Sequence, residues 1–127
     1  MWCQNTLAWY LDRTPNTTLR RRWLDAVASG DQLGGTGLSN PMKSFSSIEP
    51  LALKGTRVAG GYRVSGRLPW VSNLGPDHVF ASIFALEDGR RVMALFDCSS
   101  KGLALAHNAH FIALEGTRTY TVQIRDV

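Results

Sequence analysis

The segment 60–73, Gly-Gly-Tyr-Arg-Val-Ser-Gly-Arg-Leu-Pro-Trp-Val-Ser-Asn, constrains the fold of this chain more than any other. Its opening Gly-Gly pair suits a tight connection between two strands, because glycine adopts positive φ angles without steric cost. Tyr62 and Val64 then alternate with polar residues, which is the pattern of a half-buried strand. Pro69 carries no N–H for a ladder and interrupts that strand. The segment therefore predicts a hairpin whose second strand is broken just before a tryptophan.

The residues after this break could bind a flat heterocycle. Such a ligand needs a π-face against its plane and hydrogen-bond donors at its edge, and Trp70 and Ser72 could supply both. Tryptophan also contributes a large area to protein cores, so a buried Trp70 after a strand break explains the spacing equally well. The spacing alone does not decide between a ligand-binding and a core tryptophan.

The second half of the chain is predicted to form β-structure. Residues 79–86 and 92–96 are dense apolar strands joined through Asp88-Gly89, a strong hairpin signal, and residues 117–124 alternate cleanly. Several strands with short turns and no intervening helices are typical of an antiparallel sandwich or barrel.

Two short helices are expected ahead of these strands. The first is an apolar-rich segment that ends near Leu11 and is broken by Thr14-Pro15-Asn16. Thr17 or Thr18 can cap the second helix, which Ser29-Gly30 closes. The helices are too short to bury their tryptophans between themselves, so we expect them to dock on the sheet or on helices outside this chain. The predicted fold class is mainly β, an antiparallel β-barrel or sandwich preceded by two short α-helices.

Length and charge favour one compact domain without nucleic acid as a partner. A chain of 127 residues can bury roughly two-thirds of its unfolded surface, which is sufficient for one core. The net charge is +4, but the basic residues form no long stripe. The cluster Arg20-Arg21-Arg22 is interpreted as a solvated helix face, with an acidic partner such as a nucleotide phosphate as the alternative.

Cysteine usage and hydropathy indicate a cytoplasmic protein. Cys3 and Cys98 are too few and too far apart for a disulfide framework, which fits a reducing compartment. The sequence has neither an apolar run of membrane-spanning length nor a basic-then-apolar leader, so we expect neither membrane insertion nor secretion.

Other candidate sites carry weaker signals. His107 and His110 could ligate a metal by spacing, but no third ligand is placed with them, so no metal is expected. Gly34-Gly35-Thr36-Gly37 lacks the lysine of a phosphate-binding loop and is better explained as a strand whose bare backbone lets a ligand or a neighbouring strand approach. His78 follows Pro76-Asp77 at the entry to a strand, where we expect it to cap a turn.

Four short motifs follow one another along the chain, namely Ser39-Asn40-Pro41, Ser65-Gly66-Arg67, Trp70-Val71-Ser72-Asn73 and Arg125-Asp126-Val127. In their order and spacing they resemble the middle domain of the acyl-CoA dehydrogenase family, whose corresponding motifs are Thr-Glu-Pro, Asn-Gly-x-Lys, Trp-Ile-Thr/Ser-Asn and Asp-Val. The resemblance covers nearly the whole chain. It implies that residues 31–127 form the middle β-domain and that residues 1–30 are the end of the preceding helical domain.

The resemblance implies an FAD-dependent oxidoreductase that desaturates an acyl-CoA thioester between its α and β carbons. Leu38 and Ser39 would then hydrogen-bond the pyrimidine edge of the flavin. Trp70 would pack against the isoalloxazine, and Ser72 would hydrogen-bond near its N5. The resemblance also implies that the parent protein is a homo-oligomer.

In this family the catalytic carboxylate lies in a helical domain after the closing Asp-Val, so the resemblance places no catalytic residue in this chain. We therefore expect the chain to be a fragment that contributes part of the flavin and acyl-CoA site and is inactive by itself.

Two departures from the family pattern affect the expected substrate. Asn40 replaces a glutamate, and Met42-Lys43-Ser44-Phe45 replaces a glycine-rich loop that seats the thioester. Ser44 and Phe45 are therefore expected to contact the substrate, either holding the thioester differently or holding a non-CoA compound. The phrase Gly-Gly-Tyr-Arg-Val-Ser-Gly-Arg also resembles flavin-dependent monooxygenases of the same fold. A non-catalytic β-sandwich binding module is the third interpretation.

Overall fold

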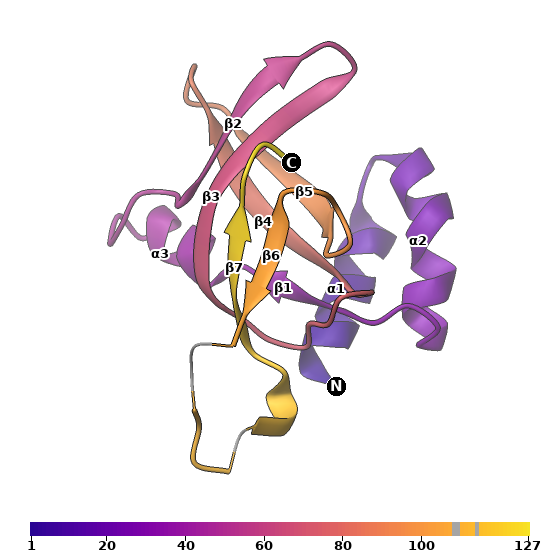
Figure 1. Ribbon diagram of the computed structural model, residues 1–127. Helices are drawn as coiled ribbons and strands as arrows, with labels where there is room; N and C mark the ends of the chain where they lie inside the picture. Colours follow the sequence, from indigo (N-terminus) through magenta and orange to yellow (C-terminus); the bar gives the residue numbers. More distant parts are fainter. Residues whose placement is uncertain (108–109, 114) are drawn as a thin grey trace.

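The computed structural model describes residues 1–107, 110–113 and 115–127. In this part of the chain, two helices precede a seven-stranded sheet and a third helix follows the first strand (Figure 1). The helical elements are α1 (Trp2–Arg13), α2 (Thr17–Ser29), α3 (Ser39–Phe45) and the 3-10 turn η1 (Glu115–Thr117). The strands are β1 (Gly34–Gly37), β2 (Leu53–Val58), β3 (Gly61–Val71), β4 (Val79–Leu86), β5 (Arg91–Asp97), β6 (Leu103–Ala106) and β7 (Tyr120–Ile124). The predicted fold class is confirmed, since strands hold more residues than helices and two helices come first.

Most strand pairs are antiparallel, but β4 has two parallel neighbours. β1 lies beside the first half of β4, with Gly34 opposite Val79, and β2 lies beside its end, with Gly55 opposite Leu86. β5 pairs with β4 through the predicted Asp88-Gly89 hairpin. From β2 the sheet continues through β3 and β7 to β6. The parallel pairs were not predicted, because alternation within a strand does not specify which strand lies beside it.

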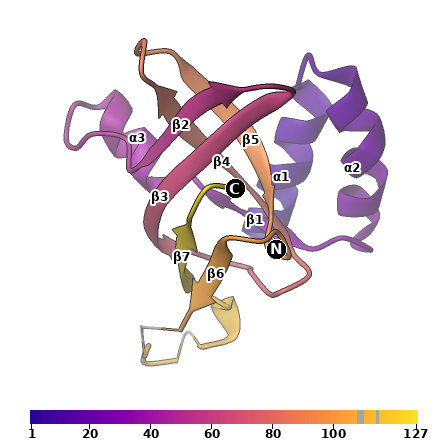
Figure 2. The ribbon, with the colours of Figure 1, turned by 45° about the horizontal axis from the view of Figure 1, so that its top comes forward.

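In the described part of the chain, two apolar clusters form the core. The larger lies among the strands, where Phe80 and Phe96 stack with ring centroids 5.2 Å apart. The smaller joins the helices to the sheet, with Leu7 and Val79 both buried in it. The expectation that the helices dock on the sheet is thus confirmed. Figure 2 shows α1 and α2 together on one side of the sheet and α3 on the opposite side.

The ends of α2 follow local signals, with one correction. Asn16 is the N-cap, because its Oδ1 accepts a hydrogen bond from the Leu19 N–H at 3.0 Å. The prediction that Thr17 or Thr18 caps the helix is therefore wrong. Asn16 follows a proline in extended backbone, from which its side chain reaches the first turn. Gly30 closes the helix in the left-handed region with φ of 87°, as predicted.

The helix α3 was not predicted, since residues 42–45 were expected to form a loop. Pro41 is accommodated in its first turn, where a backbone N–H has no helical partner in any case. A helix of seven residues carries too little apolar periodicity to be recognised from sequence.

Candidate functional site

α3 and β3 bring two of the predicted site residues together. Ser39 begins α3, Trp70 lies near the end of β3, and both line a shallow cleft of about 20 Å³. The indole of Trp70 is 64% exposed, so the alternative of a core tryptophan is wrong. A cleft this small holds about one water molecule, and a larger ligand would lie across its mouth over the indole. The other lining residues are Gly37, Asn40, Lys43, Glu49, Leu68 and Pro69.

A bulge in β3 explains why Trp70 faces solvent. Between Leu68 and Val71 the chain takes three steps, whereas the facing part of β7 takes two. Leu68 and Val71 are consequently both buried, and Trp70 between them points outward. Pro69 lies in this bulge, and its carbonyl accepts a hydrogen bond from Oγ1 of Thr121 at 2.9 Å. The break that Pro69 predicts in the strand is thus confirmed and takes the form of a bulge.

Ser72 belongs to a separate group of side chains. Its Oγ lies 2.7 Å from Oγ1 of Thr119, which in turn lies 2.8 Å from Oγ1 of Thr117. Ser72 is half-buried and is not among the residues that line the cleft of Ser39 and Trp70. Thr119 is buried and was missed by the sequence reasoning. The alternating threonines of the closing segment were the one available signal, and they do not reveal which strand they face.

Asn40 anchors the start of α3. It is 7% exposed, and its Nδ2 donates to Oε1 of Glu49 and to the Pro50 carbonyl, both at 2.9 Å. Its Oδ1 accepts from the Ala52 N–H at 2.8 Å. An ionised glutamate has no donor for the first two partners, so asparagine is suited to this position where the resembling family has glutamate.

A polar clamp fixes β1 between the helices and β3. Nδ2 of Asn73 donates to the Gly34 carbonyl at 2.6 Å. Gln4 of α1 accepts from the Gly34 N–H at 2.9 Å and donates to the carbonyls of Val27 and Gln32 at 2.8 and 2.7 Å. Asn73, the last residue of the Trp-Val-Ser-Asn motif, therefore has a structural role.

The glycines of β1 permit close approach of neighbouring strands. A Cβ on Gly35 would overlap the carbonyl oxygen of Ser72, and one on Gly34 would overlap that of Val79. The prediction of a bare strand approached by its neighbours is confirmed.

The remaining predicted site residues lie along α3, outside the cleft. Leu38 is the N-cap, and its carbonyl accepts from the Met42 N–H at 2.9 Å. Ser44 is half-buried in the last turn. The Phe45 ring is 48% exposed and lies 4.8 Å from Cζ of Arg91, at cation–π distance. The structure thus brings neither Ser44 nor Phe45 to the cleft.

The histidines take part in local contacts. Nε2 of His107 lies 3.5 Å from a carboxylate oxygen of Glu115, and its ring meets that of His110 edge-on. Within the described ranges, no three His, Cys, Asp or Glu side chains gather as a metal site. His78 is buried, and its Nδ1 lies 2.9 Å from the Asn73 carbonyl. That contact bridges the turn that His78 was expected to cap.

The arginine cluster of α2 makes contacts within the helical hairpin. Arg20 pairs with Asp12 at 2.7 Å, and the Arg22 guanidinium lies over the ring of Trp23. These contacts agree with a solvated helix face. None of the helices in the described ranges combines the length and the apolar character that a bilayer crossing requires.

Comparison with known proteins gives relatives that are much longer than this chain. No protein-family model matches the sequence. Benzylmalonyl-CoA dehydrogenase of Aromatoleum aromaticum is 26% identical over 87 residues, which are 68% of this chain and 22% of that protein. The chain therefore spans less than a quarter of this relative.

Solved structures share the fold over nearly the whole chain. Glutaryl-CoA dehydrogenase of Mycobacterium smegmatis, in complex with FADH2, matches with a TM-score of 0.81 at 21% identity, over 98% of this chain and 32% of that one. Acyl-CoA dehydrogenase of Geobacillus kaustophilus matches with a TM-score of 0.79 at 12% identity, over 95% of this chain and 33% of that one. This chain, about a third as long as those proteins, has the fold of the acyl-CoA dehydrogenase family in the region of the middle β-domain.

Proposed function

We propose that this chain forms part of the flavin and acyl-CoA site of an FAD-dependent oxidoreductase that desaturates an acyl thioester. Residues 31–127 would be its middle β-domain and residues 1–30 the end of its helical domain. The observation that carries the proposal is the exposed indole of Trp70 beside Ser39 on this fold. The matched relative, benzylmalonyl-CoA dehydrogenase, is named for a CoA thioester, and the glutaryl-CoA dehydrogenase structure of the same fold contains FADH2. Both support this class of substrate and cofactor.

The residues at the cleft fit an isoalloxazine. The plane of the ring needs an apolar face, which the Trp70 indole offers. The polar edge needs hydrogen-bonding groups, and the exposed hydroxyl of Ser39 and the backbone of Leu38 lie at the adjoining helix start. When bound, FAD supplies the acceptor for the hydride that leaves the β carbon.

Ser72 would contribute a hydroxyl oriented by its neighbours. The 2.7 Å contact with Thr119 holds its Oγ in one position. Because Ser72 lies outside the cleft, a flavin over Trp70 would reach it only by extending along β3 toward the end of that strand. In that orientation the pyrimidine edge would lie at Ser39 and the opposite part of the ring would point toward Ser72.

The chain would contribute binding groups rather than the catalytic base. Among the described residues at the cleft, Glu49 is the one carboxylate, and it accepts from Asn40 at 2.9 Å and lies 3.8 Å from Lys43. These contacts join the Glu49 side chain to two residues of α3, so we assign it a structural role. We expect the isolated chain to be catalytically silent, since positioned acid–base catalysis typically contributes about 10²- to 10⁴-fold.

FAD titration, followed by the quenching of flavin fluorescence, tests the cofactor site. Trp70→Ala should raise the Kd for FAD by roughly twofold to tenfold, which is the contribution of aromatic stacking beyond burial. Trp9→Ala is the matched control, because Trp9 is 56% exposed and belongs to α1, which lies on the side of the sheet opposite α3 (Figure 2). Equal affinities in a folded Trp70→Ala variant and its parent would contradict the site. Acyl-CoA oxidation by the isolated chain with FAD would show instead that the site is complete.

The far end of α3 would contact the thioester. Phe45 presents an aromatic face with the Arg91 cation above it, and Ser44 adds a hydroxyl in the preceding turn. Titrating the FAD-loaded chain with a panel of acyl-CoA thioesters tests this contact, with binding followed by the flavin spectrum. Phe45→Ala should weaken the binding of each acyl-CoA thioester that the parent chain binds. Unchanged affinities across the panel would remove Phe45 from the substrate site.

A further inference from the structure

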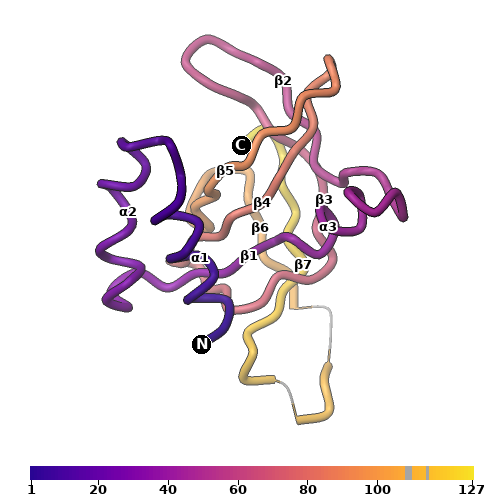
Figure 3. Tube along the Cα trace, turned by 180° about the vertical axis from the view of Figure 1, so that it is seen from behind, coloured from indigo at the N-terminus to yellow at the C-terminus, as the bar shows by residue number. Residues whose placement is uncertain are grey.

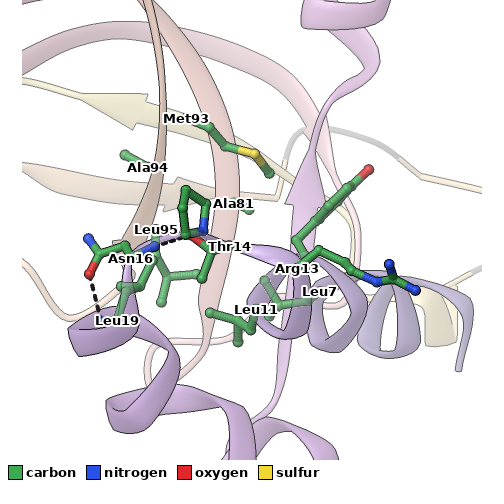
Figure 4. Close-up of a pocket in the computed structure, with 12 residues that line it drawn as sticks. Leu7, Leu11, Arg13, Thr14, Asn16, Leu19, Ala81, Met93, Ala94 and Leu95 are labelled. Carbon is green, nitrogen blue, oxygen red and sulfur yellow. Dashed lines mark hydrogen bonds between the residues drawn. The ribbon is translucent and has the colours of Figure 1, made fainter.

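An apolar groove of about 470 Å³ lies between the helical hairpin and the sheet (Figure 4). This volume lies within the range of small-molecule sites. Figure 3 shows the hairpin and α3 on opposite sides of the molecule, and the groove shares no residue with the Trp70 cleft. The proposed flavin site therefore does not extend into it. The apolar walls are formed by Leu7, Leu11, Leu19, Ala81, Met93, Ala94 and Leu95.

Polar contacts fix the helical hairpin that borders the groove. At the turn between the helices, Oγ1 of Thr14 accepts from the Asn16 N–H at 3.2 Å, and Asp12 pairs with Arg20 across the hairpin at 2.7 Å. At the other end of the hairpin, Gln4 ties α1 to α2 and β1. These contacts fix the position of α2 relative to α1 and β1. A ligand would consequently find the site already formed and would not have to order it.

The mouth of the groove at the helix turn carries positive charge. Among the described residues that line the groove, Arg13 is the one charged side chain. Its Nε lies 3.9 Å from Asp12, but that carboxylate is also bound by Arg20 at the shorter distance of 2.7 Å. One carboxylate thus faces two guanidinium groups, so this group has a net charge of one positive unit. The Arg13 guanidinium also lies over the ring of Trp9, 5.8 Å from its centroid. Thr14 and Asn16 add polar groups at the same mouth.

We propose that this groove binds an aliphatic carboxylate, with its chain among the leucines and its head group at Arg13. The positive mouth favours a single anionic head over a neutral ligand. A second hollow shares Leu19, Ala94 and Leu95 with the groove and has both Arg22 and Asp97 in its lining. These opposite charges offset one another, so the Arg13 end is the one that attracts the anion.

Isothermal titration calorimetry with decanoate, octanoate and decanol tests the proposal. Decanoate should bind saturably and about 15-fold more tightly than octanoate, because each buried methylene strengthens binding about fourfold. Arg13→Gln should weaken decanoate binding by about threefold to tenfold and leave decanol binding unchanged. Ala81→Phe should abolish the binding of both by filling the groove, because Ala81 belongs to the apolar cluster that joins the helices to the sheet.

Two variants serve as controls. Ala104 is exposed on β6 and Arg63 is exposed on β3, so Ala104→Phe and Arg63→Gln should bind decanoate like the parent chain. The proposal is overturned by the absence of saturable binding, by equal affinities for decanoate and decanol, or by displacement of decanoate by FAD. If Ala81→Phe does not fold, the chain-length series and Arg13→Gln still decide the outcome. Failure of FAD to bind would affect the flavin site alone.

Discussion

The Trp70 cleft and the groove between the helical hairpin and the sheet lie on opposite sides of one sheet, and different interactions form their walls. At the cleft, the buried side chain of Asn40 makes three hydrogen bonds. The cleft beside it has a volume of about 20 Å³. At the groove, apolar walls enclose about 470 Å³. Hydrogen bonds weaken steeply with distance and angle, whereas apolar contacts are non-directional. The hydrogen bonds of Asn40 therefore fix the cleft side closely, whereas the groove has apolar walls that can accommodate ligands of different length between the polar contacts at the two ends of the hairpin.

The largest expected difference between the two sides concerns buried leucines. Leu68→Ala should lower the free energy of unfolding by about 3–5 kcal/mol, because Leu68 is 2% exposed within the sheet cluster and its removal leaves a cavity. Leu11→Ala should cost about 2–3 kcal/mol, since Leu11 already borders an open groove. Urea denaturation of both variants measures these losses. Equal losses would indicate that the groove is closed in solution.

The polar anchor of α3 gives the next effect. Asn40→Ala should lower the free energy of unfolding by about 2–3 kcal/mol, because it leaves the Ala52 N–H and the Pro50 carbonyl without their partner. Asn5 is exposed on α1, and Asn5→Ala is the matched control with little expected effect. A loss below about 0.5 kcal/mol for Asn40→Ala would show that hydrogen bonds do not fix the cleft side.

Alkaline pH should reveal the dense packing of the sheet. Burial, assisted by the negative charges of Asp97 and Asp77, raises the pKa of the Cys98 thiol from 9.0 to about 12. The unfolded chain therefore releases this proton first as the pH rises, and the stability due to the neutral thiol declines between about pH 9 and pH 12. At about pH 10.5 the decline should reach about 1–2 kcal/mol. Cys98→Ala should remove it, and an identical alkaline decline in parent and variant would contradict this burial.

The smallest expected effect on stability is that of Trp70. Because its indole is 64% exposed, Trp70→Ala should change the free energy of unfolding by less than about 0.5 kcal/mol. Urea denaturation of the same variant used for FAD titration measures this change. A large loss would assign the indole a packing role and would weaken its interpretation as a ligand-binding surface.

Within the candidate site, sequence predicted the residue types but only part of their arrangement. The motif order placed Ser39 and Trp70 as site residues, and the structure brings these two together at one cleft. Ser72 instead joins Thr119, which is 47 positions away in sequence. Phe45 lies at the other end of a helix that was not predicted. No local pattern specifies such distant partners.

The sequence by itself determined the local elements of this protein. Glycines close the predicted hairpins and the second helix, with φ of 82° at Gly60 and Gly89 and 87° at Gly30, because few other residues adopt that backbone without strain. Tertiary structure alone decided the parallel pairing of β1 and β2 with β4, the groove between the helical hairpin and the sheet, and the outward direction of Trp70. Those features depend on which surfaces meet across the fold, and a bulge of one residue is enough to turn a side chain from the core to solvent.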